Sequence, residues 1–142
     1  LGKLHHPLPM LSASEVRPCC LYGVGKAFGE NIASLYHDRF GISCICLRIG
    51  GLSDDDDWRS HGTSGLPLWL SHRDASQLVK LCIDAPSSVG YAVVYGISSN
   101  TLRFTEIETA RDILGYEPQD DAGADISPGL DAELPHDSDH SE

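Results

Sequence analysis

Two side chains that can work together in proton transfer stand four residues apart near the start of the chain. Tyr22 and Lys26 have the spacing that brings two side chains onto one face of a helix, with Cβ atoms about 6 Å apart. An ammonium group this close to a phenol favours the phenolate, and so lowers the pKa of a phenol from its ordinary value of about 10. The pair therefore predicts a general acid/base that works near neutral pH.

A helix over residues 21–40 is expected to hold this pair. Its large apolar side chains recur at the spacing of a core-facing stripe, and these are Val24, Phe28, Ile32, Leu35 and Tyr36. Gly25 and Gly29 each cost a helix about 1 kcal/mol relative to alanine. Their presence indicates the close approach of another backbone or of a ligand.

The rest of the chain alternates strands and helices, as α/β proteins do. Residues 42–49 form a near-continuous apolar run ended by two glycines, which is typical of a parallel strand covered on both faces. Further expected elements are a helix over residues 72–85, a strand over residues 91–97 and a short helix over residues 105–114. Ser71 is predicted to cap the first of these helices, and Gly115 to end the second.

Six segments of the sequence come in an order that is typical of one enzyme family. They are LYGVGKAFGE (21–30), FGI (40–42), LRIG (47–50), WLSHRD (69–74), VVYGISSNT (93–101) and LGYEP (114–118). Over about residues 15–121 the chain resembles the C-terminal half of the extended short-chain dehydrogenase/reductases, in the NAD-dependent epimerase/dehydratase family, and most closely its uronate-dehydrogenase-like branch. The resemblance implies the C-terminal part of a Rossmann-like, doubly wound parallel sheet, with the N-terminal nucleotide-binding half absent from this chain.

The resemblance also implies roles for individual residues. Tyr22 matches the catalytic acid/base, and Lys26 matches the residue that binds the nicotinamide ribose and tunes that tyrosine. Both thus belong to the cofactor site, together with Leu52, while Gly51 lies where the family contacts its substrate. Uronate dehydrogenases carry a serine at the position of Gly51, so the change removes a hydrogen-bonding side chain and puts uronate as the substrate in question.

An acidic loop follows the first strand, with four aspartates at positions 54–57 and then Trp58 and Arg59. The spacing does not fit an EF-hand, because Arg59 occupies the glycine position and no glutamate closes the loop. By resemblance, Arg59 matches the carboxylate-binding arginine of the family and would suit an acidic or phosphorylated sugar. A surface ion pair between Arg59 and the loop aspartates is the equal alternative.

Composition excludes several classes of function. A net charge of −11 argues against nucleic acid or an anionic membrane as partner, and no apolar run approaches the length of a membrane span. Five cysteines, an odd number, indicate reduced thiols in a cytoplasmic protein, and neither Cys44-x-Cys46 nor His5-His6 predicts a metal site. The scarcity of lysine beside abundant aspartate suits a surface adapted to concentrated salt, and equally an ordinary acidic protein.

The cofactor is expected to be NAD or NADP, held by this chain at one end only. Gly23, Gly25 and Gly29 mimic a dinucleotide fingerprint, but that motif must follow a strand, and residues 17–20 read RPCC. No other glycine cluster in the sequence is placed to cradle a pyrophosphate at a helix N-terminus.

Three regions are predicted: a loop over residues 1–18, the dehydrogenase part over residues 19–118, and a disordered acidic tail over residues 119–142, which has few large apolar residues. Two functions remain open. One is an NAD(P)-dependent oxidoreductase or epimerase acting on a sugar, sugar acid or sugar phosphate. The other is a non-catalytic fragment of such an enzyme, or a module that forms a homodimer through exposed helix faces.

Overall fold

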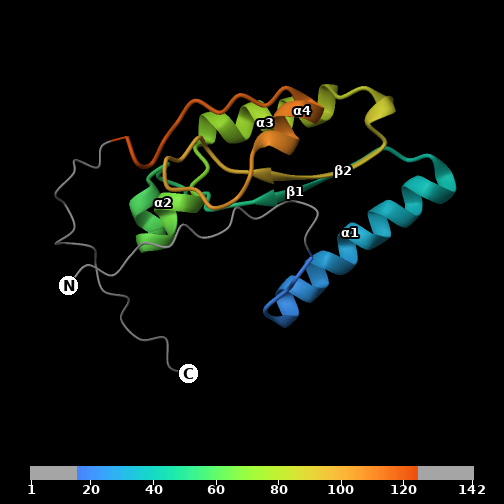
Figure 1. The fold of residues 1–142 in the computed structure, drawn as a ribbon, viewed down its shortest axis with the longest axis horizontal. Coiled ribbons are helices and arrows are strands. Elements are labelled where there is room, and N and C mark those ends of the chain that lie inside the picture. The colour runs from blue at the N-terminus through green and yellow to red at the C-terminus, as the bar shows by residue number, and fades with distance from the viewer. Residues whose placement is uncertain (1–15, 125–142) are drawn as a thin grey trace.

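The computed structural model describes residues 16–124. The elements in chain order are α1 (Leu21–Phe40), β1 (Cys44–Ile49), the 3-10 helix η1 (Trp58–Ser64), α2 (Gly65–Leu68), α3 (His72–Asp84), the 3-10 turn η2 (Ser87–Val89), β2 (Tyr91–Gly96) and α4 (Glu108–Leu114). The two strands lie between α1 on one side and α3 and α4 on the other (Figure 1). This is the three-layer arrangement of an α/β protein, as predicted.

The strands β1 and β2 pair in parallel, with Cys44 opposite Tyr91 and Ile49 opposite Gly96. Parallel neighbours cannot be joined by a hairpin, so the chain crosses over through η1, α2 and α3. Beyond the strand ends, Gly51 forms a parallel bridge to Trp69, and the Ser98 N–H donates to the Trp69 carbonyl at 2.9 Å. The segment around Trp69 thus contacts the chain that leaves each strand.

The core lies on the α3 and α4 face of the sheet. Alternate residues of β2 are buried there, because successive side chains of a strand point to opposite faces. The centre of this core consists of Leu78 from α3, Val94 from β2, Ala110 from α4 and Tyr116. The Tyr116 hydroxyl donates to the Ile97 carbonyl at 3.0 Å, which fixes the chain after α4.

The other face carries α1, and here the predicted core-facing stripe is wrong for the part of the chain that the structure describes. No residue of α1 is buried. The five apolar side chains expected in the core are exposed, with Val24 at 50%, Phe28 at 66%, Ile32 at 37%, Leu35 at 43% and Tyr36 at 47% of their surface. A two-stranded sheet is too narrow to cover a 20-residue helix, so the stripe has no described partner.

Two boundaries differ by more than one residue from those predicted. The first strand begins at Cys44, after Gly41 ends α1 in the left-handed conformation (φ 67°), and its residues are half-buried with Ile49 exposed. The last helix begins at Glu108 where residue 105 was expected. There the glutamate carboxylates, not a threonine hydroxyl, accept the first N–H groups, from Ile107 at 2.9 Å and Thr109 at 2.8 Å.

Candidate functional site

Tyr22 and Lys26 lie at the beginning of α1. The helix starts after Cys20, which has extended dihedral angles and whose carbonyl accepts the Val24 N–H at 3.0 Å. The Lys26 ammonium lies over the Tyr22 ring, with Nζ 5.1 Å from the ring centroid, which is within the range of a cation–π contact. Both side chains are exposed. The structure therefore brings the pair together as the spacing predicts, and its catalytic role stays a prediction.

A second pair, which the sequence analysis missed, docks α1 onto the sheet. Glu30 lies one turn beyond Lys26, and Arg48 lies on β1. The Arg48 guanidinium donates hydrogen bonds to both carboxylate oxygens of Glu30, with Nε 2.8 Å from Oε1 and Nη2 2.9 Å from Oε2. These hydrogen bonds from Glu30 are the main reason that the pKa of Arg48 lies above its ordinary value. A charge inside an apolar strand needs a partner, and that signal could have identified Arg48.

Two tyrosines of β2 complete this contact. The Tyr91 hydroxyl donates to the Glu30 carbonyl at 3.1 Å, and Arg48 lies over the Tyr95 ring at 5.6 Å from the centroid. These polar groups thus hold α1 to the sheet, while its apolar stripe stays exposed.

Gly51 lies in a tightly packed strand end. Its N–H donates to the Leu68 carbonyl at 2.7 Å, and its own carbonyl accepts the Leu70 N–H at 2.8 Å. A Cβ atom added at Gly51 would lie 2.8 Å from Cδ2 of His61, so the imidazole occupies the space that a serine side chain would need. Leu52 follows at this edge and is exposed. His61 was missed by the sequence analysis, because no local pattern places η1 over the end of β1.

Arg59 binds within its own loop. Its Nη1 lies 3.2 Å from Oδ1 of Asp57, and its guanidinium lies 4.6 Å from the centroid of the Trp58 ring. This is the geometry of the surface-pair alternative, and substrate binding by Arg59 stays a prediction.

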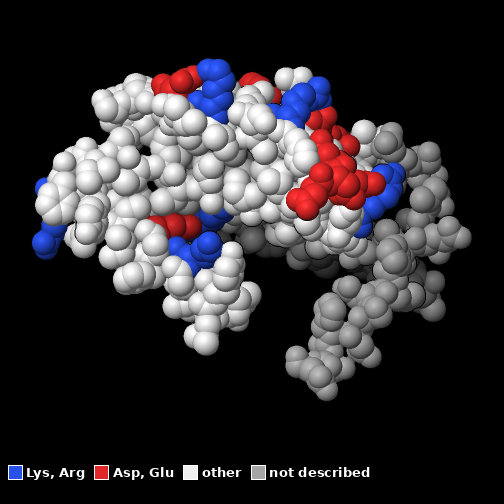
Figure 2. Space-filling model, turned by 180° about the vertical axis from the view of Figure 1, so that it is seen from behind, with Lys and Arg blue, Asp and Glu red and all other residues white. Residues whose placement is uncertain are grey.

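Acidic side chains gather in a patch on the face seen in Figure 2. No group of three His, Cys, Asp or Glu side chains within residues 16–124 is arranged to hold a metal ion.

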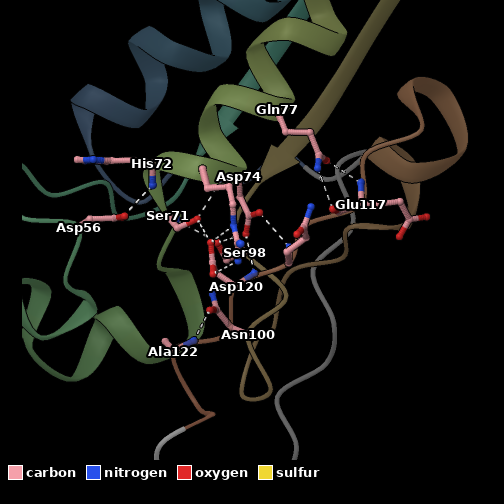
Figure 3. A network of polar contacts seen from close by, with 12 residues as sticks. Asp56, Ser71, His72, Asp74, Gln77, Ser98, Asn100, Glu117, Asp120 and Ala122 are labelled. Atoms are coloured by element: carbon pink, nitrogen blue, oxygen red, sulfur yellow. Dashed lines mark hydrogen bonds and ion pairs between the residues drawn. The ribbon is translucent and has the colours of Figure 1, made fainter.

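A buried polar network lies at the N-terminus of α3 (Figure 3). The Asp74 carboxylate accepts three hydrogen bonds, from the Ser98 hydroxyl at 2.6 Å, the Gln119 N–H at 2.9 Å and the Asp120 N–H at 3.1 Å. Ser71 accepts the Asp74 N–H at 3.1 Å, so it caps α3 as predicted. Each of these groups has its partner inside the network, which indicates a structural role and not a ligand site.

The network also corrects the boundary of the predicted tail. Residues 119–124 belong to the fold: the Asp120 carboxylate accepts from the Ser71 hydroxyl at 2.6 Å and pairs with Arg73, and Ala122 is buried. Burial acts to raise the pKa of Asp120, but the Ser71 hydrogen bond and the Arg73 pair outweigh it and leave that pKa below its ordinary value. These polar residues are ordered because each meets a specific partner, which composition does not reveal. The remainder of the predicted tail lies outside the described residues, as do residues 1–15 of the predicted loop.

Replacing Asp74 by asparagine should destabilise the chain by about 2–3 kcal/mol. The Asp74 carboxylate accepts hydrogen bonds from two backbone N–H groups, and an amide nitrogen in its place could not accept them. Urea unfolding followed by circular dichroism measures this loss. Asp112→Asn on the exposed surface of α4 is the matched control and should change the free energy of unfolding by less than about 0.5 kcal/mol. Equal effects from the two variants would contradict a structural role for the network.

The glycines of α1 do not form a dinucleotide-binding turn. Gly23, Gly25 and Gly29 all lie inside the helix, and an added Cβ at Gly25 or Gly29 would meet nothing within 4 Å. The close approach expected at these two glycines is therefore not made by any described residue. None of the described glycines forms a pyrophosphate-binding turn after a strand, and the binding of the nicotinamide end by Tyr22 and Lys26 stays a prediction.

Comparison with known proteins identifies sugar dehydrogenases. No family model matches the sequence. The chain is 40% identical over 118 residues to the NAD-dependent glucose-6-phosphate dehydrogenase of Haloferax volcanii, a match that covers 83% of this chain and 44% of that protein. It is 36% identical over 104 residues to the uronate dehydrogenase of Pseudomonas putida, covering 73% and 37%. It is 32% identical over 113 residues to the L-arabinose 1-dehydrogenase (NAD(P)(+)) of Haloferax volcanii, covering 75% and 44%.

The solved structures that resemble this chain are also dehydrogenases. The uronate dehydrogenase of Agrobacterium tumefaciens superposes with a TM-score of 0.69 at 35% identity, over 82% of this chain and 42% of that chain. A mutant of the same enzyme complexed with NAD gives a TM-score of 0.69 at 34% identity, with the same coverage. The chain thus spans less than half the length of the relatives it matches. Within residues 16–124, no helix is long and apolar enough to cross a membrane.

Proposed function

Since this chain belongs to the extended short-chain dehydrogenase/reductases and corresponds to part of their uronate-dehydrogenase-like members, we propose that it supplies the catalytic half of an NAD(P)-dependent oxidoreductase. The substrate is a sugar, sugar acid or sugar phosphate. The single observation that carries this proposal is the contact between Lys26 and Tyr22 at the start of α1.

The two side chains divide the work of proton transfer. The Tyr22 phenolate accepts the proton of the substrate hydroxyl during oxidation and returns it in the reverse reaction. Lys26, whose ammonium lies over the Tyr22 ring, also binds the nicotinamide ribose. Bound NAD or NADP would supply the hydride acceptor for the carbon that bears this hydroxyl. Leu52, exposed at the end of β1, is the third proposed cofactor contact.

The strand end argues for a substrate other than uronate. The His61 imidazole lies where the serine of uronate dehydrogenases would extend from Gly51. A sugar phosphate fits the 40% identity to a glucose-6-phosphate dehydrogenase, and Arg59 would bind such a phosphate only after leaving Asp57. We therefore rank sugar phosphate first, neutral sugar second and uronate third.

The exposed apolar stripe of α1 indicates that another protein surface packs on this helix. Five large apolar side chains on one helix face are unusual on a free surface. A nucleotide-binding half packed there would cover them and bring the pyrophosphate site that residues 16–124 do not form. A second copy of the chain would also cover them, which is the homodimer alternative.

The five cysteines are free thiols in the structure, as suits a cytoplasmic protein.

The direct test uses a restored enzyme, which we define as this chain joined behind the nucleotide-binding half of the Haloferax volcanii glucose-6-phosphate dehydrogenase. Glucose 6-phosphate, L-arabinose and glucuronate are supplied with NAD and with NADP, at low and high salt, and reduced nicotinamide is followed by absorbance. We expect turnover, highest with the sugar phosphate. A folded, NAD-binding restored enzyme that oxidises none of the three sugars would favour the non-catalytic alternative.

A further inference from the structure

We propose that Arg48 keeps Lys26 on Tyr22 by occupying the carboxylate of Glu30, which would otherwise draw the lysine away. Arg48 and Glu30 are then positioning residues and do not touch the substrate. This inference rests on the proposed function, because it assumes that the contact between Lys26 and Tyr22 serves catalysis.

The competition follows from the helix itself. Tyr22, Lys26 and Glu30 follow one another at intervals of four residues, so Lys26 has a phenol on one side and a carboxylate on the other. Among the residues three or four positions from Lys26, Glu30 is the only acid. An ion pair between a lysine and a glutamate four residues later stabilises an exposed helix, although less than the reverse order does. Without a third group, Lys26 would therefore divide its time between the two neighbours.

Arg48 removes this choice. Its planar fork binds both oxygens of Glu30, with distances of 2.8 Å and 2.9 Å, in the bidentate geometry that is stronger than a pair with an ammonium. The pair is largely covered, since the side chains of Arg48 and Glu30 expose 19% and 14% of their surface. Lys26 makes no ion pair with any residue that the structure describes, and its ammonium lies over the Tyr22 ring.

Arg48 is itself fixed by the sheet. Its Nη1 donates to the Tyr95 hydroxyl at 3.4 Å, and its position on β1 lies just before the strand end that carries Gly51. A guanidinium stays charged at all relevant pH, so Arg48 keeps its positive charge under all assay conditions. The same ion pair thus ties the acid/base helix to the edge of the sheet where the substrate is proposed to bind.

The test compares Arg48→Met with the double variant Arg48→Met/Glu30→Gln in the restored enzyme. Methionine keeps most of the arginine stem but frees the Glu30 carboxylate, so Lys26 should move to it. We expect Arg48→Met to lower kcat at least 10-fold. The double variant should regain most of that loss, because the glutamine amide no longer attracts Lys26. Glu30→Gln alone should cost less turnover than Arg48→Met.

A purely structural role for the pair predicts that the double variant recovers no turnover. If the ion pair only docked α1, the double variant would be no more active than Arg48→Met, and that result would overturn the proposal. Arg111→Met, which breaks the exposed ion pair to Glu117 after α4, is the matched control and should leave turnover unchanged. Tyr22→Phe is measured alongside: retention of turnover by that variant would remove the proposed function itself.

A second measurement needs no activity. In NMR spectra of the 142-residue chain, the side-chain methylenes of Lys26 should show nuclear Overhauser contacts to the Tyr22 ring. These contacts should weaken in Arg48→Met and return in the double variant. Contacts that persist unchanged in a folded Arg48→Met chain would contradict the proposal even if the restored enzyme proved inactive.

Discussion

Replacing Tyr22 by phenylalanine is expected to lower kcat of the restored enzyme by about 10²- to 10⁴-fold, the range that a positioned general acid/base contributes. The phenol oxygen is the proposed proton acceptor, and phenylalanine keeps the ring on which the Lys26 ammonium lies. Because the loss falls on the transition state and not on ground-state binding, KM for the sugar should change little.

Steady-state rates with glucose 6-phosphate and NAD measure this effect. Tyr36→Phe is the control, because Tyr36 is an exposed tyrosine of the same helix that packs on Phe40 at 5.3 Å between ring centroids. It should leave kcat within about 2-fold, since it removes no group from the proposed site. If Tyr22→Phe behaved like Tyr36→Phe, the acid/base would have to be another residue.

Features that depend on neighbours in the sequence could be predicted. The spacing of Tyr22 and Lys26 placed them together because a helix brings residues four apart into contact. Ser71 caps α3 and Gly115 ends α4 with φ at 71°, since both signals are read within one turn of the helix. The parallel pairing of β1 and β2 likewise follows from apolar strands separated by a helix.

Features that join distant segments could not be predicted in this way. Glu30 meets Arg48 across 18 residues, and Asp74 meets Gln119 across 45 residues, so no local pattern pairs them. For the same reason the boundary of the tail was placed too early: the polar composition of residues 119–124 suggests disorder until their partners on α3 are known. The apolar stripe of α1 is a third case, because a periodic pattern predicts that a face is covered without identifying what covers it.

The 142-residue chain alone should bind NAD with a dissociation constant above about 1 mM, which corresponds to a binding free energy weaker than about −4 kcal/mol. Tyr22 and Lys26 are proposed to bind the nicotinamide ribose only, whereas pyrophosphate is normally held by a glycine-rich turn at a helix N-terminus. The described glycines of α1 lie inside the helix and cannot form such a turn. The restored enzyme, which regains the turn, should bind NAD at least about 100-fold more tightly.

Isothermal titration calorimetry at high salt measures both affinities, because screening is expected to favour folding of a chain with a net charge of −11. Lys26→Met in the restored enzyme provides the control: it should weaken the binding of NAD but not that of ADP, which lacks the nicotinamide ribose. Micromolar binding of NAD by the 142-residue chain would overturn the view that it is only the catalytic half. Equal loss of NAD and ADP binding in Lys26→Met would instead move Lys26 away from the nicotinamide end of the site.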